Sequence, residues 1–323
     1  MQVYREFSMF LPVILFFAGL LLLYFGAEYM VSGSSRFALS FGIRPLVIGM
    51  TVVALATSMP EMMVSLAAVL KGTSDIAAGN IIGSNIANVG LILGAAAILA
   101  PMRVDPNTLR KDIPIMLAAS VLLVLFSLDG VLGFTDGLLL VAGLIAFIVY
   151  CVVSGRRSVT ARPAEETVVA EEKRHRRRDL VLILVGIVGL GVGAELMVRS
   201  AIIIARAAGL SDMLIGITIV ALGTSLPELA ASMMGAWRGE MDLSVGNVIG
   251  SNIFNLLFVL GTCAMIRPIA IEPAALRFEV PVMLLFSFAL LPLIGRRMRL
   301  GRTEGGLLLL GYLMFIGFYF LQS

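Results

Sequence analysis

The strongest constraint on the fold is that the sequence matches itself, without a gap, at an offset of 167 residues. Segment 49–65 (GMTVVALATSMPEMMVS) is identical to segment 216–232 (GITIVALGTSLPELAAS) at 10 of 17 positions. Segment 79–88 (GNIIGSNIAN) is identical to segment 246–255 (GNVIGSNIFN) at 8 of 10 positions. The chain is therefore a duplicated unit, and its fold must contain two copies of the same pair of motifs.

Hydropathy identifies the duplicated unit as a set of membrane spans. Of the 323 residues, 59% are hydrophobic and 14% are charged, with a mean hydropathy of +1.01. Soluble domains carry about 25% charged residues. A soluble enzyme is excluded, because the chain has too few charged residues to cover the surface of a soluble domain. The first apolar run, Met9 to Met30, is too long for a cleaved signal peptide and is expected to span the membrane. Ten apolar stretches of about 20 residues have their centres near residues 20, 56, 88, 120, 142, 190, 223, 255, 284 and 312.

The two copies are expected to cross the membrane in opposite directions. A charge-rich linker, 154–179, separates the five spans of 1–153 from the five spans of 180–323. Since five is an odd number, the second copy enters the membrane inverted, as in many secondary transporters with a site at the midplane. We therefore predict an all-α polytopic membrane protein with ten transmembrane helices in two inverted five-helix repeats. The repeated motifs occupy 49–94 and 216–261.

The distribution of basic residues predicts the orientation in the membrane. Eighteen of the 24 Lys and Arg residues fall in one set of alternate loops, which includes the linker, and six fall in the other set. The positive-inside rule places the first set in the cytoplasm. We expect a protein of the plasma (inner) membrane, with both termini outside the cytoplasm and the 154–179 linker inside it.

Polar residues at membrane depth are concentrated in the repeated motifs. Glu61 and Glu228 lie in the middle of their spans, where an isolated carboxylate is costly unless it has a partner or a function. Pro60 and Pro227 precede them and remove backbone amides, so we predict broken helices with free carbonyls at the midplane. Helical spacing gathers oxygen-bearing residues on one face of each span. These are Ala54, Thr57, Ser58 and Glu61; Ala221, Thr224, Ser225 and Glu228; and, in the following spans, Ser84 with Asn88 and Ser251 with Asn255.

This set of residues offers only oxygen ligands, which suit hard cations such as Ca²⁺ and Na⁺ and not soft metals. The lone histidine, His175, lies in the linker, and Cys151 and Cys263 lie in apolar runs, so a disulfide framework is not indicated. One Ca²⁺, monovalent cations or two protons could neutralise the two carboxylates. Because an empty site would leave two like charges desolvated, we expect obligatory exchange of one cation load for another. Neither a prosthetic group, nor nucleic acid, nor an obligatory protein partner is expected.

The paired motifs resemble the two α-repeats of the sodium/calcium exchanger family, within the cation/Ca²⁺ antiporter superfamily, and the chain is identified as a prokaryotic member. The resemblance covers both halves and essentially all ten spans. It implies a Ca²⁺ site formed by Thr57, Glu61, Thr224 and Glu228. It implies flanking Na⁺ sites formed by Ser58, Ser84, Ser225 and Ser251 with the carbonyls of Ala54 and Ala221, and a centre completed by Asn88 and Asn255. The first and sixth spans would slide across this core to alternate access.

Asn255 departs from the family pattern, because many of these exchangers, including the potassium-dependent branch, carry Asp at this position. The neutral amide removes one charge, which leaves potassium dependence and the coupling ion open. Na⁺/Ca²⁺ antiport is the leading interpretation, and a Ca²⁺/H⁺ antiporter using the same glutamates is the alternative. A cation channel is a remote alternative, because the inverted repeat argues against it. An intramembrane hydrolase would need a nucleophile and a base that the spans do not offer.

Overall fold

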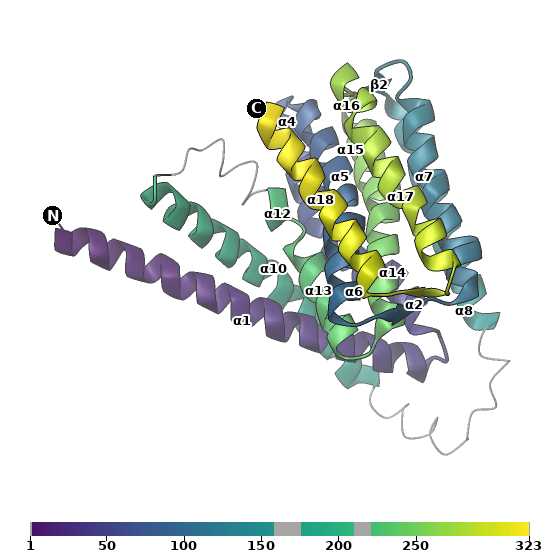
Figure 1. Ribbon diagram of the computed structural model, residues 1–323, viewed down its shortest axis with the longest axis horizontal. Coiled ribbons are helices and arrows are strands. Elements are labelled where there is room, and N and C mark those ends of the chain that lie inside the picture. The colour runs from purple at the N-terminus through teal and green to yellow at the C-terminus, as the bar shows by residue number, and fades with distance from the viewer. Residues whose placement is uncertain (1, 158–175, 210–220, 323) are drawn as a thin grey trace.

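The computed structural model describes residues 2–157, 176–209 and 221–322. Most of the predicted linker, 158–175, and the start of the second motif, 216–220, therefore lie outside the described residues. The described part is almost entirely helical, and a helix lies at each of the ten predicted span centres (Figure 1). Within these described residues, six helices are long and apolar enough to cross a membrane, or seven if one bent pair counts as a single span. The complete set of ten spans in two inverted repeats stays a prediction.

The elements of the two halves follow one another in a similar order. The first half contains α1 (Gln2–Ser40), α2 (Pro45–Ile48), η1 (Gly49–Val53), α3 (Ala54–Thr57), α4 (Met59–Lys71), α5 (Ser74–Ala87), η2 (Asn88–Leu93), α6 (Gly94–Leu99), β1 (Met102–Arg103), η3 (Thr108–Asp112), α7 (Ile113–Phe126), β2 (Val131–Leu132) and α8 (Phe134–Arg157). The second half contains α10 (Arg176–Ala207), α12 (Ala221–Gly223), α13 (Leu226–Trp237), α14 (Met241–Ile253), η7 (Phe254–Leu260), α15 (Gly261–Ile266), β3 (Ile269–Ala270), α16 (Pro273–Arg277), α17 (Glu279–Gly295), β4 (Arg299–Leu300) and α18 (Arg302–Gln322). The segments labelled η are π-helical turns, which occur often at functional sites.

The two long helices α1 and α10 pack side by side, and the N-terminal end of α1 extends away from the other helices (Figure 1). Glycines allow this close approach. A Cβ atom built on Gly26 would lie 2.7 Å from the backbone nitrogen of Leu190, and one built on Gly19 would lie 2.7 Å from the carbonyl oxygen of Gly193. Because contacts of this length leave no room for a side chain, the two backbones touch directly, as in small-residue interfaces of membrane helices.

The corresponding helices of the two halves, α5 with its continuation η2 and α14 with its continuation η7, cross each other in the core. Asn88 donates a hydrogen bond to Asn252 over 3.0 Å, and Asn255 donates one to Asn85 over 3.2 Å. The later residue on one helix thus meets the earlier residue on the other, so the two helices run antiparallel. This direction is the one that an inverted repeat requires of these two segments.

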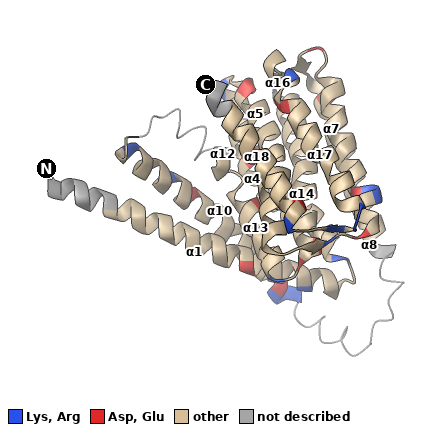
Figure 2. Ribbon diagram, viewed as in Figure 1, with Lys and Arg blue, Asp and Glu red and all other residues tan. Residues whose placement is uncertain are grey.

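Two short strand pairs also connect the halves. Strand β1 pairs with β4, with Met102 opposite Leu300, and β2 pairs with β3, with Val131 opposite Ala270. Each pair is antiparallel and joins a strand of the first half to a strand of the second. Figure 2 shows that charged residues gather mainly near the ends of the helices, as expected for a bundle whose middle lies in lipid.

The predicted helix breaks are present in both halves. Between α3 and α4, Ser58 leaves helical geometry (φ −79°, ψ 4°), and the helix bends by 43°. Between α12 and α13, Ser225 adopts nearly the same conformation (φ −89°, ψ 7°). Pro60 and Pro227 occupy the first turn of the helix that follows each break, where the missing amide has no intrahelical partner in any case. The proline therefore fixes where the second segment begins.

Candidate cation-binding site

Both glutamates lie in the first turn of the helix that follows a break, Glu61 in α4 and Glu228 in α13. Their side chains are 1% and 0% exposed. The N-terminal end of a helix carries unpaired N–H groups and the positive end of the helix dipole, which stabilise a negative charge. The local fold thus places each carboxylate at a helix end that lowers the free-energy cost of burying its negative charge.

Hydroxyl groups from the opposite half contact each carboxylate. Ser225 donates to Oε1 of Glu61 over 3.0 Å, and Ser58 donates to Oε1 of Glu228 over 3.2 Å. Ser84, in α5, also lies 3.4 Å from Oε1 of Glu61 and 3.4 Å from the hydroxyl of Ser225. The carboxylates and serines that the sequence predicts as ligands are therefore brought together in reciprocal contacts across the two halves.

Thr57 links the first break to α14. Its hydroxyl lies 3.4 Å from the hydroxyl of Ser251 and donates to the side-chain oxygen of Asn247 over 3.2 Å. The same hydroxyl lies 3.4 Å from the carbonyl oxygen of Ala54, one of the predicted carbonyl ligands. Ala221, which corresponds to Ala54 in the second half, lies in α12, and the side chain of Ala221 is outside the described part.

Several buried oxygen atoms of the predicted ligands have no hydrogen-bond partner. Within the described part of the chain these are Oε2 of Glu61 and of Glu228, Oδ1 of Asn88 and of Asn255, and the hydroxyl of Thr224. Leaving a buried polar atom unpaired costs about 1–3 kcal/mol, and more if it is charged. Five such atoms on one set of predicted ligands fit a function in which a cation completes their coordination.

Basic side chains do not neutralise these carboxylates. Among the described side chains, neither glutamate forms an ion pair with a Lys or Arg; the printed pairs, such as Arg36 with Asp179 and Arg238 with Glu28, lie elsewhere. Among the described residues, no group of three or more His, Cys, Asp and Glu side chains is placed to hold a metal ion. The charge of the site is thus left for a mobile cation or for protons to balance.

A cavity of about 530 Å³ lies beside this site, between α4 and α10. It is lined on one side by Pro60 and Met63, on the other by Leu190 and Glu195, and it reaches Thr224. On the corresponding face of the other half, α1 packs against α13, and Glu28 of α1 forms an ion pair with Arg238. The cavity therefore gives access to Thr224, a predicted ligand, from the side of the molecule on which α10 lies.

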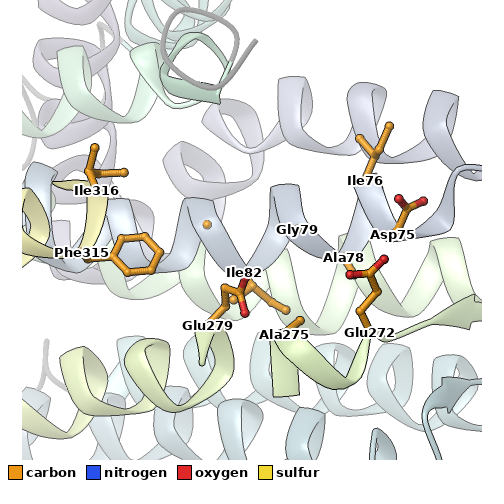
Figure 3. A pocket seen from close by; sticks show the side chains of 11 residues that line it. Asp75, Ile76, Ala78, Gly79, Ile82, Glu272, Ala275, Glu279, Phe315 and Ile316 are labelled. Carbon is orange, nitrogen blue, oxygen red and sulfur yellow. The ribbon is translucent and has the colours of Figure 1, made fainter. Parts of the chain in front are cut away.

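A second cavity, of about 400 Å³, has carboxylates along its wall (Figure 3). Asp75 of α5, Glu272 at the start of α16 and Glu279 of α17 line it, and Phe315 of α18 lies at one end. Asp75 and Glu272 are exposed, and none of the predicted ligands lines this cavity. These acidic residues are therefore separate from the candidate site.

The structure adds supporting residues that the predicted ligand set did not include. Asn80 donates to Ser65 over 3.0 Å and to the backbone carbonyl of Glu61 over 3.4 Å. Asn247 repeats both contacts in the second half, with Ser232 over 2.9 Å and with the carbonyl of Glu228 over 3.4 Å. Each asparagine thus holds the turn that carries a glutamate. The sequence could have indicated these residues, because Asn80 matches Asn247 and Ser65 matches Ser232 at the 167-residue offset.

Comparison with known proteins shows the family of this chain. The sequence pattern of the family described as sodium/calcium exchanger protein matches residues 11–153 and 179–321. The chain belongs to the sodium/calcium exchanger family. It is therefore a multi-pass membrane transporter, a cation/Ca²⁺ antiporter and not an enzyme, as the sequence motifs predict.

Relatives of this exchanger match it along nearly the whole chain. The sodium/calcium exchanger MaX1 of Methanosarcina acetivorans is 32% identical over 343 residues, covering 92% of this chain and 95% of that protein. The inner membrane protein YrbG of Escherichia coli is 37% identical over 322 residues, covering 98% of each chain. A structure of the sodium-calcium exchanger NCX_Mj soaked with 10 mM Na⁺ and 10 mM Sr²⁺ has a TM-score of 0.84 at 36% identity, covering 96% of this chain and 98% of that chain.

Proposed function

We propose that this protein exchanges Na⁺ for Ca²⁺ by alternating access, with Ca²⁺ bound between Glu61 and Glu228 near the middle of the membrane. Thr57 and Thr224 would complete the Ca²⁺ site. Four serines and two backbone carbonyls would bind the Na⁺ ions, with the two central asparagines between them: Ser58, Ser84, Ser225, Ser251, Ala54, Ala221, Asn88 and Asn255.

The observation that carries the proposal is the pair of buried glutamates with reciprocal serine contacts. Each carboxylate accepts a hydroxyl hydrogen bond at Oε1 and keeps Oε2 without a partner. Two charges in a buried, all-oxygen site match the charge and the ligand preference of one Ca²⁺ ion. The serine hydroxyls add neutral oxygens that suit Na⁺, which favours sodium coupling over proton coupling.

Coupling follows from the cost of leaving the site without cations. Two buried carboxylates of like charge repel each other and lose their hydration, so the unloaded site is unfavourable in the middle of the membrane. Rearrangement between the two faces is then easiest when Ca²⁺ or Na⁺ occupies the site. The names of the relatives MaX1 and NCX_Mj as sodium/calcium exchangers support the choice of Na⁺ as the counter-ion.

We further propose ten spans in two inverted repeats, residing in a prokaryotic plasma (inner) membrane. The antiparallel crossing of α5 and α14 supports the inversion, and the name of the relative YrbG, an inner membrane protein, supports the compartment. The excess of Lys and Arg in one set of loops supports an orientation with both termini outside the cytoplasm and the linker inside.

The test is Ca²⁺ uptake into proteoliposomes that contain the purified full-length protein. One set of vesicles carries an outward Na⁺ gradient and a second set an outward proton gradient. Glu61→Gln and Glu228→Gln remove one charge each and should abolish uptake while the protein stays folded. Glu240→Gln, at the start of α14 and outside the site, is the matched control and should keep uptake.

Each outcome of this experiment decides between the candidate functions. Uptake driven by Na⁺ alone supports the proposal. Uptake driven by protons alone would replace it with Ca²⁺/H⁺ antiport through the same glutamates. A steady downhill Ca²⁺ current without any counter-ion would indicate a channel. Robust uptake by either glutamine variant would contradict the assignment of the site.

A further inference from the structure

Four buried asparagines meet where α5 and its continuation η2 cross α14 and its continuation η7, and their side-chain amides form one equivalent pair of hydrogen bonds between the halves. All four are at most 1% exposed. Asn88 donates through Nδ2 to Oδ1 of Asn252, and Asn255 donates through Nδ2 to Oδ1 of Asn85. Because a side-chain amide has its donor and its acceptor on opposite branches, each bond turns the oxygen of Asn88 or Asn255 away from its partner. Those two oxygens are the ones left without a hydrogen bond.

Two methionines orient the inner asparagines, Asn85 and Asn252. The amide nitrogen of Asn85 lies 3.8 Å from the sulfur of Met283 in α17, and that of Asn252 lies 3.6 Å from the sulfur of Met116 in α7. The amide nitrogen of Asn252 also donates to the backbone carbonyl oxygen of Asn85 over 3.5 Å. A thioether sulfur only accepts hydrogen bonds, so it holds the nitrogen of the amide on its own side. Met283 is 1% exposed and Met116 is 0% exposed, and the two are related by the same 167-residue offset as the asparagines.

We propose that two relays, Met283–Asn85–Asn255 and Met116–Asn252–Asn88, fix the amide oxygens of Asn255 and Asn88 as cation ligands. This inference rests on the proposed function, in which those two oxygens bind transported cations. In the first relay the sulfur of Met283 sets the inner amide, and in the second the sulfur of Met116 does so together with the backbone carbonyl of Asn85. In each relay the inner amide presents its oxygen to the outer amide, and the outer amide presents its oxygen to the cation. The inner asparagines and the methionines are positioning residues, because they act through Asn255 and Asn88.

The relay explains why orientation matters in this site. If the amide of Asn85 turned over, its NH₂ group would face the NH₂ group of Asn255, and two donors cannot pair. Asn255 would then turn as well and present N–H groups, which repel a cation, in place of its oxygen. Binding would weaken although every side chain remained in place.

The relay also gives a physical reason for asparagine at position 255. A carboxylate at this position has no N–H group to donate to Oδ1 of Asn85. An aspartate there would force Asn85 to turn over and to leave the sulfur of Met283. Asn255, Asn85 and Met283 therefore form a matched set, in which the neutral amide is the residue that the relay accepts.

Replacing Met283 by leucine tests the first relay. Leucine keeps the apolar volume, which such swaps tolerate well, but it removes the sulfur acceptor. We expect Met283→Leu to raise the KM for Ca²⁺ uptake about three-fold with little change in kcat, and Asn85→Ala to raise it about ten-fold, as for the loss of a weak and of an ordinary hydrogen bond. Met102→Leu, at another fully buried methionine, is the control and should leave KM unchanged.

A double-variant cycle separates the relay from simple packing. Asn85→Asp supplies an acceptor-only side chain, which receives the hydrogen bond of Asn255 in either orientation. The added charge of Asn85→Asp can itself change KM. Adding Met283→Leu to that variant should change KM no further. An equal effect of Met283→Leu in both backgrounds, or no effect of Met283→Leu alone, would overturn the relay.

Thermal unfolding tests the inference independently of the proposed function. The melting temperature is measured without Ca²⁺ for the wild type, Met283→Leu, Asn85→Asp and the double variant. The relay belongs to the resting structure, so the effect of Met283→Leu on the melting temperature should also vanish in the Asn85→Asp background. Wild-type protein that transported no Ca²⁺ with either gradient would contradict the proposed function. The melting cycle would still decide the relay, because additive shifts in melting temperature would refute it.

Discussion

Replacing Gly186 by alanine tests the direct backbone contact between α1 and α10. A Cβ atom on Gly186 would lie 2.6 Å from the backbone nitrogen of Met30 and 2.7 Å from the carbonyl oxygen of Gly26. An ordinary contact begins at 3.4 Å, so the helices must separate by about 0.8 Å. Because both obstructing atoms belong to backbone, they cannot turn aside, and overpacking of this kind costs about 1–3 kcal/mol.

Gly191→Ala is the matched control on the same helix. Among the described residues, a Cβ built there meets no atom within 4 Å apart from its chain neighbours and the backbone of its own helix. Alanine is favoured over glycine in a helix by about 1 kcal/mol, and this gain applies to both variants, so their difference isolates the contact. The difference in unfolding free energy should therefore be about 1–3 kcal/mol in favour of Gly191→Ala.

The assay is thermal unfolding of both variants in the same detergent. Each kcal/mol corresponds to about 2 °C in a chain of this size, so Gly186→Ala should melt at least about 2 °C below Gly191→Ala. Equal melting temperatures, or the reverse order, would refute the close contact and with it the packing of α1 on α10.

Three further predictions concern charge and topology. Glu28→Gln and Arg238→Gln should each lower the melting temperature, and the double variant should lose less than their sum, with a coupling of about 1 kcal/mol or less because Arg238 is half exposed; additive losses would show that the pair is not formed. Arg177→Cys should react with a membrane-impermeant maleimide in inside-out vesicles only, since the linker end is expected in the cytoplasm; labelling of intact cells would reverse the topology. Asn255→Asp should change the Na⁺ or pH dependence of uptake more than the amount of folded protein, and an unchanged profile would argue against a central place for Asn255.

The sequence predicts the helix breaks and the equivalence of the two halves, because duplication and local chemistry are sufficient for both. Two copies of a motif at a fixed offset show that Glu61 and Glu228 are equivalent, and the proline before each one predicts the helix break that the structure contains. Both arguments concern residues that are close in the chain. The family assignment follows from the same motifs, and it is confirmed.

What the sequence does not predict depends on how helices cross. The contact of Asn85 with Met283 joins residues 198 positions apart, and that of Ser58 with Glu228 joins residues 170 positions apart. Periodicity places a residue on a helix face but does not say which helix it meets. The offset of 167 residues relates Met116 to Met283, yet a methionine in an apolar span also suits ordinary packing, so only the structure shows the sulfur beside an amide.

The reciprocal contacts of Ser58 with Glu228 and of Ser225 with Glu61 mean that each half of the chain supplies one carboxylate and the hydroxyl for the other. A half-chain alone would therefore carry half of the candidate site, and under the proposed inverted topology it would need a second copy inserted in the opposite orientation. Joining the copies in one polypeptide turns their encounter into an intramolecular event at high effective concentration. It also lets them diverge, as Ala56 and Gly223 already have, so that one side of the molecule can be tuned without altering the other.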